Sequence, residues 1–479
     1  MAYTTINDPS AYFQTALYTG NGGTQSITND GNSNLRPDWI WGTLRDEDGG
    51  ARFMFDSVRG ATKRVKTNAN TEEQVRDGVS SFNADGFTLG SHTDSNSNNE
   101  TAVAWQWAAG GATPTQTYKV VVVSDSGNKY RFRNSADNAT YAASAVTLDL
   151  QEGGTYTFDV SDSSVSSHPF VIGTSANSNE YSTGVTYKLD GVTKTYSQYT
   201  SGFSAATTRQ LIITVAASAP TLYYWCSVHS GMGGQINTNS EFGSTNFDGS
   251  ILSKASVNTT AGFSIATWTG NGTGGATIGH GLGAVPHLMI VKKRSGADDF
   301  AVYHQDMASD PQTDYINLNG DGAKTDSVDR WNDTSPTSTV ATLGDAGAVN
   351  GNSATYVGYF FNSIKGYSKF GSYNGNNNVN GTFVYTGFKP AFIILKNTER
   401  TQDWRLYDAR RPGFNVNTMS LKINETTVES SGNQLDILSN GFKFRTNDGD
   451  ANGYDENHIY WAFAKRPIVA SNNIVGLAG

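Results

Sequence analysis

The sequence predicts an all-β protein made of sandwich-like domains, and three observations lead to this prediction. Apolar residues occur in short alternating runs of β-branched and aromatic side chains, such as residues 118–123 and 210–215, and helical periodicity is almost absent. Glycine accounts for 52 of the 479 residues, and Gly, Asn and Asp bound the apolar runs as turn residues do. The 23 Tyr, 23 Phe and 9 Trp supply the apolar mass for packed cores.

The chain contains three copies of one sequence unit, the first of them in its N-terminal part. Each copy begins with an aromatic residue followed by Thr or Asn, Gly and Asn, at residues 18–22, 268–272 and 373–377. A proline that precedes an apolar strand follows 17 to 19 residues later in each copy; these are Pro37, Pro286 and Pro390. Each copy continues with a partner strand, at residues 51–56, 300–304 and 404–408. Each copy then ends on an aromatic strand, at residues 103–107, 356–360 and 459–463.

The proline spacing locates an insertion after the first copy. Pro286 and Pro390 are 104 residues apart, whereas Pro37 and Pro286 are 249 apart, which leaves 145 additional residues between Trp107 and Trp268. We therefore predict five segments. They are a first β-sandwich repeat with an N-terminal attachment segment (1–112), an inserted sandwich (113–238), a linker (239–261), a second repeat (262–366) and a third repeat (367–479).

The inserted segment contains the only cysteine, in a Cys226-x-x-His229-x-x-Met232 motif at the end of an apolar strand. Upstream, a strand at 156–160 leads to His168. This combination resembles the cupredoxins, and the resemblance implies copper held by His168, Cys226 and His229, with Met232 as a weak axial ligand. A trigonal His₂Cys set with a long axial Met is the blue-copper arrangement. The alternative is a scaffold sandwich in which the four residues only pack, since free Cys is commonly buried and inert.

The repeats resemble a second group of proteins. Residues 259–270, 278–286 and 385–396 resemble tail-fibre and virion structural proteins of marine tailed phages, cyanophages especially. The resemblance implies a virion surface protein made in the host cytoplasm, without an assigned catalytic centre. Its expected partners are other virion proteins and a host cell-surface receptor such as a glycan, and a homo-oligomer, a trimer, is expected.

Three function classes stay open at this point. The first is a tail fibre or appendage that attaches to a host by multivalent binding. The second is a capsid decoration or head-fibre protein, and the third is a polysaccharide-degrading spike or a copper redox protein. Coiled-coil heptads and a long β-helix repeat are absent from the sequence, which disfavours a depolymerase, and we expect no enzyme.

Composition excludes other classes. With 34 basic and 43 acidic residues the formal charge is −9, which argues against nucleic-acid partners because these are bound through clustered Lys and Arg. No run of about 18 apolar residues occurs, so we expect no membrane insertion. The N-terminus lacks the pattern of a signal peptide, and one cysteine excludes a disulfide framework.

Two weaker signals are interpreted as structural. Residues 448–453 match the first half of an EF-hand loop, but Ile459 stands at the twelfth position instead of Glu, so we predict a polar hairpin tip without calcium. His280, His287 and His304 belong to the second repeat at positions where the other repeats carry different residues, and we expect ordinary surface or core histidines.

Overall fold

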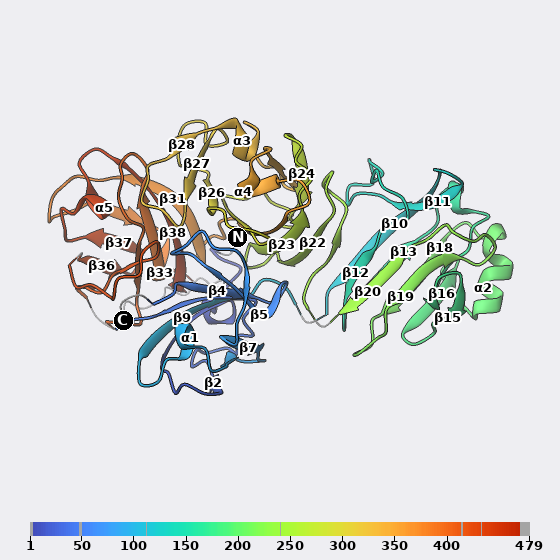
Figure 1. The fold of residues 1–479 in the computed structure, drawn as a ribbon, viewed down its shortest axis with the longest axis horizontal. Helices are drawn as coiled ribbons and strands as arrows, with labels where there is room; N and C mark the ends of the chain where they lie inside the picture. Colours follow the sequence, from blue (N-terminus) through green and yellow to red (C-terminus); the bar gives the residue numbers. More distant parts are fainter. Residues whose placement is uncertain are drawn as a thin grey trace. The chain divides into compact units, whose positions relative to one another are not determined.

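The computed structural model describes residues 3–46, 50–111, 113–239, 241–412, 415–432 and 434–469. The first two and last ten residues, part of the predicted attachment segment and third repeat, lie outside the described residues. Almost all regular structure is β-strand, so the all-β prediction is confirmed (Figure 1). In the described ranges, no helix has the length and apolarity needed to cross a membrane.

The chain divides into two compact units. The repeat unit comprises Met1–Ala109, Val257–Ala276 and Leu282–Gly479, and the insert unit comprises Gly110–Ser256 and Thr277–Gly281. The repeat unit holds the three sequence repeats except Thr277–Gly281 of the second, and the insert unit holds most of the extra residues that the proline spacing locates together with that short segment.

The first repeat forms a large sheet with the strand order β1-β9-β3-β4-β5-β6 and a small sheet β2-β8-β7. The strands are β1 (Phe13–Thr19), β2 (Gln25–Ile27), β3 (Trp39–Leu44), β4 (Phe53–Asp56), β5 (Gly60–Lys66), β6 (Gln74–Val75), β7 (Val79–Phe82), β8 (Phe87–Leu89) and β9 (Thr101–Trp107). Two short helices, η1 (Pro9–Ala11) and α1 (Thr93–Asn96), accompany them.

The second repeat continues with the strand order β23-β30-β25-β26-β27-β28. Its strands and helical turns are β23 (Phe263–Thr269), β24 (Ala276–Gly279), β25 (Leu288–Lys293), β26 (Ala301–His304), β27 (Asp314–Asn317), β28 (Thr325–Asp326), α3 (Val328–Trp331), β29 (Val340–Leu343), α4 (Gly347–Asn350) and β30 (Thr355–Phe361).

The third repeat has a large sheet β31-β38-β33-β34-β35 and a small sheet β32-β37-β36. Its elements are β31 (Ser368–Asn374), β32 (Phe383–Tyr385), β33 (Phe388–Asn397), β34 (Arg405–Asp408), β35 (Leu421–Lys422), β36 (Leu435–Leu438), β37 (Gly441–Phe444), α5 (Gly449–Asn452) and β38 (Asn457–Pro467). The large sheets of the three repeats share one order of neighbouring strands: β1-β9-β3-β4 in the first repeat, β23-β30-β25-β26 in the second and β31-β38-β33-β34 in the third. The repeats in the sequence therefore correspond to one repeated strand topology.

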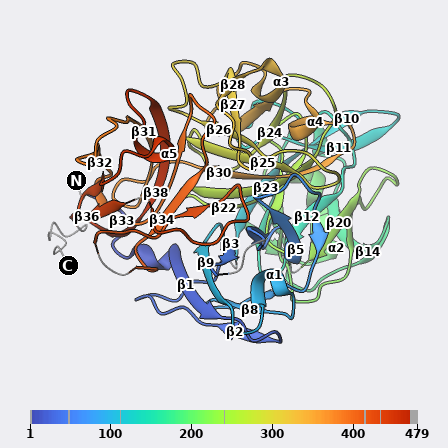
Figure 2. The same cartoon turned by 60° about the vertical axis from the view of Figure 1, so that its left-hand side comes forward.

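The three large sheets bury their apolar faces against one another in a common core. The Phe13 ring of the first repeat lies 5.5 Å from that of Phe392 in the third, and the Trp39 ring lies 4.8 Å from that of Tyr359 in the second. Phe361 of the second repeat packs on Phe463 of the third at 5.8 Å. Every repeat thus contacts both others, and Figures 1 and 2 show the blue, yellow and orange-to-red repeats side by side.

A buried cation joins each repeat to the one before it. Lys292 Nζ donates to the Asn70 carbonyl of the first repeat at 3.0 Å. Lys396 Nζ donates to the Asp321 carbonyl of the second repeat, also at 3.0 Å. A third buried cation, Arg52, joins the first repeat to the third: its Nε donates to the Lys422 carbonyl at 3.0 Å. Because buried charges need such partners, these contacts tie each repeat to its neighbours.

The Gly-Asn motifs have a role that the sequence pattern did not reveal. A fully buried asparagine at the end of a helical turn accepts, through Oδ1, the backbone N–H of the motif asparagine in each repeat. The acceptor and donor pairs are Asn96 with Asn21, Asn350 with Asn271, and Asn452 with Asn376. The hairpin tip predicted at residues 448–453 is therefore wrong: Asp448 caps the one-turn helix α5 and presents Asn452 to the motif.

The insert unit is a sandwich of two sheets around its own core. The sheets have the orders β11-β10-β13-β18-β16-β17 and β12-β20-β19-β14-β15. The strands are β10 (Thr115–Ser124), β11 (Asn128–Phe132), β12 (Leu148–Gln151), β13 (Thr155–Asp159), β14 (Phe170–Ser175), β15 (Ser178–Glu180), β16 (Val185–Leu189), β17 (Val192–Lys194), β18 (Arg209–Thr214), β19 (Leu222–Cys226) and β20 (Gln235–Asn239). The helices are η2 (Ser163–Val165), α2 (Tyr196–Gly202) and η3 (Phe203–Ala205).

The segment predicted as a linker, 239–261, differs from that expectation. It contains two paired strands, β21 (Ser244–Asn246) and β22 (Ser253–Asn258). Phe247 is buried in the core of the insert unit, and the Tyr118 hydroxyl donates to the Thr245 carbonyl at 3.0 Å. The polar composition of this segment concealed the two strands. Its few aromatic residues are separated by Ser and Asn, yet a single one, Phe247, packs into the core of the insert unit.

Candidate functional site

Strand pairing in the insert unit brings His168 and Cys226 together. β14 and β19 are antiparallel, and Phe170 at the start of β14 is the register partner of Cys226 at the end of β19. The Ser227 amide donates to the Pro169 carbonyl at 3.0 Å, so the pairing extends one step further. His168 and Cys226 are thus 58 positions apart in the sequence, but their side chains lie at the same end of the sandwich.

The geometry of the cluster is that of three converging ligands. His168 Nδ1 lies 3.0 Å from His229 Nδ1, and Cys226 Sγ lies 3.9 Å and 3.7 Å from these two nitrogens. Cys226 is 2% exposed and His168 6% exposed, whereas His229 is exposed. The structure thus brings together three of the four residues that the sequence predicts as ligands.

These separations fit a single bound ion. Two imidazole nitrogens about 2.0 Å and a thiolate about 2.3 Å from one centre, spread by about 120°, lie roughly 3.5 to 3.8 Å apart. The observed nitrogen–sulfur separations of 3.7 and 3.9 Å are close to that arrangement, and the nitrogen–nitrogen separation of 3.0 Å is about 0.5 Å shorter than it requires. A thiolate with two imidazoles is also a donor set that suits Cu(I) and Cu(II).

Met232 lies on the loop that leaves Cys226 and is buried in the core of the insert unit with it. The Tyr130 amide on β11 donates to the Met232 carbonyl at 2.9 Å. The loop needs Gly231, which has a φ of +75°, and Gly233, where a Cβ would lie 1.7 Å from the Tyr224 carbonyl oxygen. The role of Met232 as axial ligand stays a prediction.

Strand β11 supplies two supporting residues that sequence reasoning missed. The Tyr130 hydroxyl donates to the His168 carbonyl at 2.8 Å, which fixes the backbone beside the cluster. Burial raises the pKa of Tyr130 well above its usual value, and the neighbouring Cys226 raises it further. The Asn128 amide lies 3.4 Å from His168 Nε2. The contacting atom is the amide nitrogen Nδ2, a donor, which can donate to the His168 ring at Nε2.

The electrostatics of the cluster favour neutral imidazole. Burial lowers the pKa of His168, and the adjacent His229 lowers it further because two protonated rings would repel each other. A neutral ring is the form that binds a metal, so the cluster does not have to lose a proton from His168 at neutral pH.

The three histidines interpreted as structural have structural partners. His287 Nδ1 lies 2.9 Å from the Ser363 hydroxyl, and His304 Nε2 lies 3.2 Å from the Tyr460 carbonyl. Burial lowers the pKa of His304 to about 3, so it is a neutral core residue. His280 is fully buried as well.

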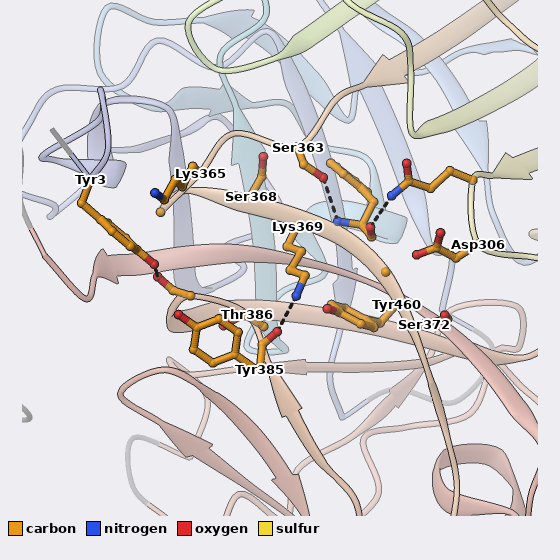
Figure 3. Close-up of a pocket in the computed structure, with 15 residues that line it drawn as sticks. Tyr3, Asp306, Ser363, Lys365, Ser368, Lys369, Ser372, Tyr385, Thr386 and Tyr460 are labelled. Atoms are coloured by element: carbon orange, nitrogen blue, oxygen red, sulfur yellow. Dashed lines mark hydrogen bonds between the residues drawn. The ribbon is translucent and has the colours of Figure 1, made fainter. Parts of the chain in front are cut away.

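A second candidate site lies in the repeat unit, where the second and third repeats meet. This cavity of about 720 Å³, here called the junction pocket, is shown in Figure 3. Its principal polar and aromatic lining residues are Tyr3, Asp306, Lys365, Lys369, Tyr385 and Tyr460. Sequence reasoning missed the pocket because its residues come from two repeats and the N-terminal segment.

A family model for a domain of unknown function, DUF7483, matches residues 8–131 and 235–467. The chain belongs to the DUF7483 family. No curated protein and no solved structure matches it. The two matched ranges include all of the described strands of the repeats. The first range also covers the beginning of the insert unit, and the second covers its end.

In this DUF7483 protein the candidate metal cluster lies outside the matched ranges. His168, Cys226 and His229 fall between residues 131 and 235, in the part of the insert unit that the family model skips. The junction pocket, in contrast, is lined by residues of the second matched range together with Tyr3. The two candidate sites therefore belong to different parts of the chain and need separate tests.

Proposed function

We propose that this DUF7483 protein is a virion surface protein without enzymatic activity. Its repeat unit acts in host attachment as part of a tail fibre or appendage, and its insert unit binds one copper ion. Attachment is supported by the resemblance of residues 259–270, 278–286 and 385–396 to phage virion proteins.

The construction of the repeat unit suits attachment. Three sandwiches share one core and one set of buried junctions, so their loops are held on a rigid support. Aromatic side chains are exposed on the repeats, such as Tyr385 at the end of β32 at 51% and Tyr454 in a loop at 74% exposure. Weak contacts of this kind gain avidity of about 10²–10⁴-fold when several copies bind together on one particle.

The copper proposal depends on one observation, the convergence of His168, Cys226 and His229. A copper ion bound there supplies a one-electron redox centre. The chain itself brings the Nδ1 atoms of both imidazoles together and buries the Cys226 thiol. Of the three residues, only His229 is exposed to water.

The copper proposal is tested by titrating the purified chain with Cu(II). We expect one ion per chain and a strong visible absorption from thiolate-to-copper charge transfer, which Cys226→Ser abolishes. His92→Asn, a histidine substitution in the first repeat, is the matched control and keeps the colour. Failure to bind copper in the fully reduced, folded chain would leave the cluster as packing in a scaffold sandwich.

The attachment proposal is tested by adding purified chain to host cells before infection. We expect the chain to bind the cells and to block adsorption of the phage that carries it, without releasing sugars. A location on the capsid without cell binding would favour a decoration protein instead, and released oligosaccharides would indicate a polysaccharide-degrading spike. The solution mass of the chain tests the expected trimer.

A further inference from the structure

The junction pocket is formed by the way the repeats close on one another. It lies between β31, the first strand of the third repeat, and the residues that follow β26 of the second repeat, Gln305 and Asp306. Residues 385–387, at the end of β32 and directly after it, form another wall. The N-terminal Tyr3 closes the end near β32, where its hydroxyl donates to the Gly387 carbonyl at 2.8 Å.

A related cavity at another junction shows which features of the pocket are special. Between the third and first repeats, a cavity of about 250 Å³ is lined by Phe13 and Gln14 of β1 and by Arg410, which follows β34. Arg410 holds the place that Asp306 holds in the pocket, because Asp408 and His304 are equivalent ends of their strands. There Arg410 forms an ion pair with Asp30, so the group in the place of Asp306 is paired within the lining of the cavity.

The Asp306 carboxylate has no such arrangement. In the described part of the chain, no hydrogen bond or ion pair engages its oxygens, although its backbone groups are bonded. Burial raises the pKa of Asp306, and the charges of His287 and Lys369 oppose that rise. A partly buried carboxylate without a hydrogen-bond donor is a group that a ligand hydroxyl would satisfy.

Toward the opposite end of the pocket two ammonium groups lie on phenol rings, with Lys365 beside Tyr3 and Lys369 nearer the middle (Figure 3). Lys365 Nζ lies 4.6 Å from the centre of the Tyr3 ring, and Lys369 Nζ lies 5.6 Å from that of Tyr385. Lys369 Nζ also donates to the Tyr385 carbonyl at 2.6 Å, which leaves it further donors for a ligand. Figure 3 shows Tyr3 and Tyr385 at this end and Asp306 beside Tyr460 at the other.

These two ends select one kind of small molecule. Two ammonium groups attract a carboxylate, aromatic edges and faces accept the apolar C–H side of a ring, and Asp306 accepts a hydroxyl proton. Ser372, near Tyr460, and Thr386, near Tyr385, also line the pocket (Figure 3). A ligand with a carboxylate at one end and hydroxyls at the other fits both.

We propose that the junction pocket binds an acidic saccharide, with its carboxylate at Lys369 and a ring hydroxyl at Asp306. This inference rests on the proposed role in attachment and names the chemistry of the receptor. It also assigns the pocket to the second and third repeats, since in the corresponding cavity between the third and first repeats Arg410 stands in the place of Asp306 and is paired with Asp30.

The test is calorimetric titration of the full chain with three acidic oligosaccharides: tetragalacturonate, a hyaluronan tetrasaccharide and a sialic-acid trimer. Each is compared with its methyl ester, which keeps the ring and removes the charge. We expect saturable binding of at least one acid, and a loss of about tenfold or more on esterification or on Lys369→Met. Asp306→Asn weakens the acid and the ester alike, because it changes the hydroxyl end.

Tyr454→Ala is the matched control, since this tyrosine of the third repeat is exposed and lies outside the pocket. It leaves affinity unchanged, and circular dichroism melting shows that each variant is folded. Absence of binding by all three acids, equal binding of acid and ester, or unchanged affinity of folded Lys369→Met would each overturn the proposal.

The two proposals fail in distinguishable ways. If wild type and Lys369→Met block phage adsorption equally well, attachment stands and the receptor does not use this pocket. If the saccharide binds the pocket but the chain does not bind host cells or block adsorption, the pocket stands and the attachment proposal is wrong.

Discussion

The repeat unit and the insert unit are both built from β-sheets, but they bury those sheets in different ways. In the insert unit two sheets cover each other and enclose a core of their own. In the repeat unit, one face of each large sheet is buried only by the other two repeats, through residues such as Trp39, Phe361 and Phe463. The difference teaches that sequence repeats need not be independent domains, whereas the insertion between them is one.

The largest expected effect of this difference concerns isolated fragments. We expect residues 110–256 expressed alone to fold, because they contain the insert core almost complete. Residues 1–109 alone should stay unfolded or aggregate, since Trp39, Trp107 and Phe13 would face water. Chemical-shift dispersion in nuclear magnetic resonance spectra of the two fragments measures this. A well-dispersed spectrum from monomeric residues 1–109 would contradict the comparison.

The sequence predicts the repeats well because their information is local. Turn glycines, strand prolines and aromatic closing strands recur in order, and their spacing places the insertion. The closure of the repeats depends on residues that are far apart, such as Arg52 with Lys422, and no local pattern specifies such pairs. The helical turn at 449–452 was missed because its signal is one buried asparagine.

At the candidate metal centre, the cluster of three candidate ligands could be predicted from the sequence, whereas the residues that support the cluster could not. Cys226 and His229 occur in one motif, and the register of two strands brings His168 to them. Tyr130 and Asn128 come from a strand whose alternating pattern indicates only a half-buried edge. Tyr130 and Asn128 contact His168 because of the way the two sheets pack, and this packing cannot be inferred from the sequence of the strand alone.

The next effect in size concerns a buried charge at a repeat junction. Asp408 Oδ2 accepts from Trp105 Nε1 of the first repeat at 3.1 Å and from Arg411 Nε at 2.6 Å, and all three side chains are buried. Removing the carboxylate leaves Arg411 without its closest anion, so Asp408→Ala should lower the free energy of unfolding by about 3–5 kcal/mol. Urea denaturation measures it.

The control for that substitution is Asp345→Ala, at an exposed aspartate of the second repeat. A change within about 0.5 kcal/mol is expected there. If Asp408→Ala were as mild as the control, the repeats would not be held together by this junction.

The smallest expected effect is a pH dependence confined to the repeat unit. Burial lowers the pKa of Lys396 to about 8, although its ammonium donates to the Asp321 and Asn397 carbonyls. Between pH 8 and about 10.4, the ordinary lysine value, the unfolded chain binds more protons than the folded one at this residue. Raising the pH through that window therefore favours the folded state, by at most about 1.4 kcal/mol per pH unit.

The measurement is the difference in unfolding free energy between wild type and Lys396→Met at pH 7.5, 8.5 and 9.5. The difference should be constant below pH 8 and shift in favour of wild type above it. Buried tyrosines, whose pKa values are raised, ionise in the unfolded chain first and destabilise the fold near pH 10, but they are common to both proteins and cancel. Lys465→Met, at an exposed lysine, should show no such shift. A flat difference would mean that the Lys396 ammonium keeps its proton through the window because its carbonyl partners offset its burial, and the junctions would then contribute stability without sensing pH.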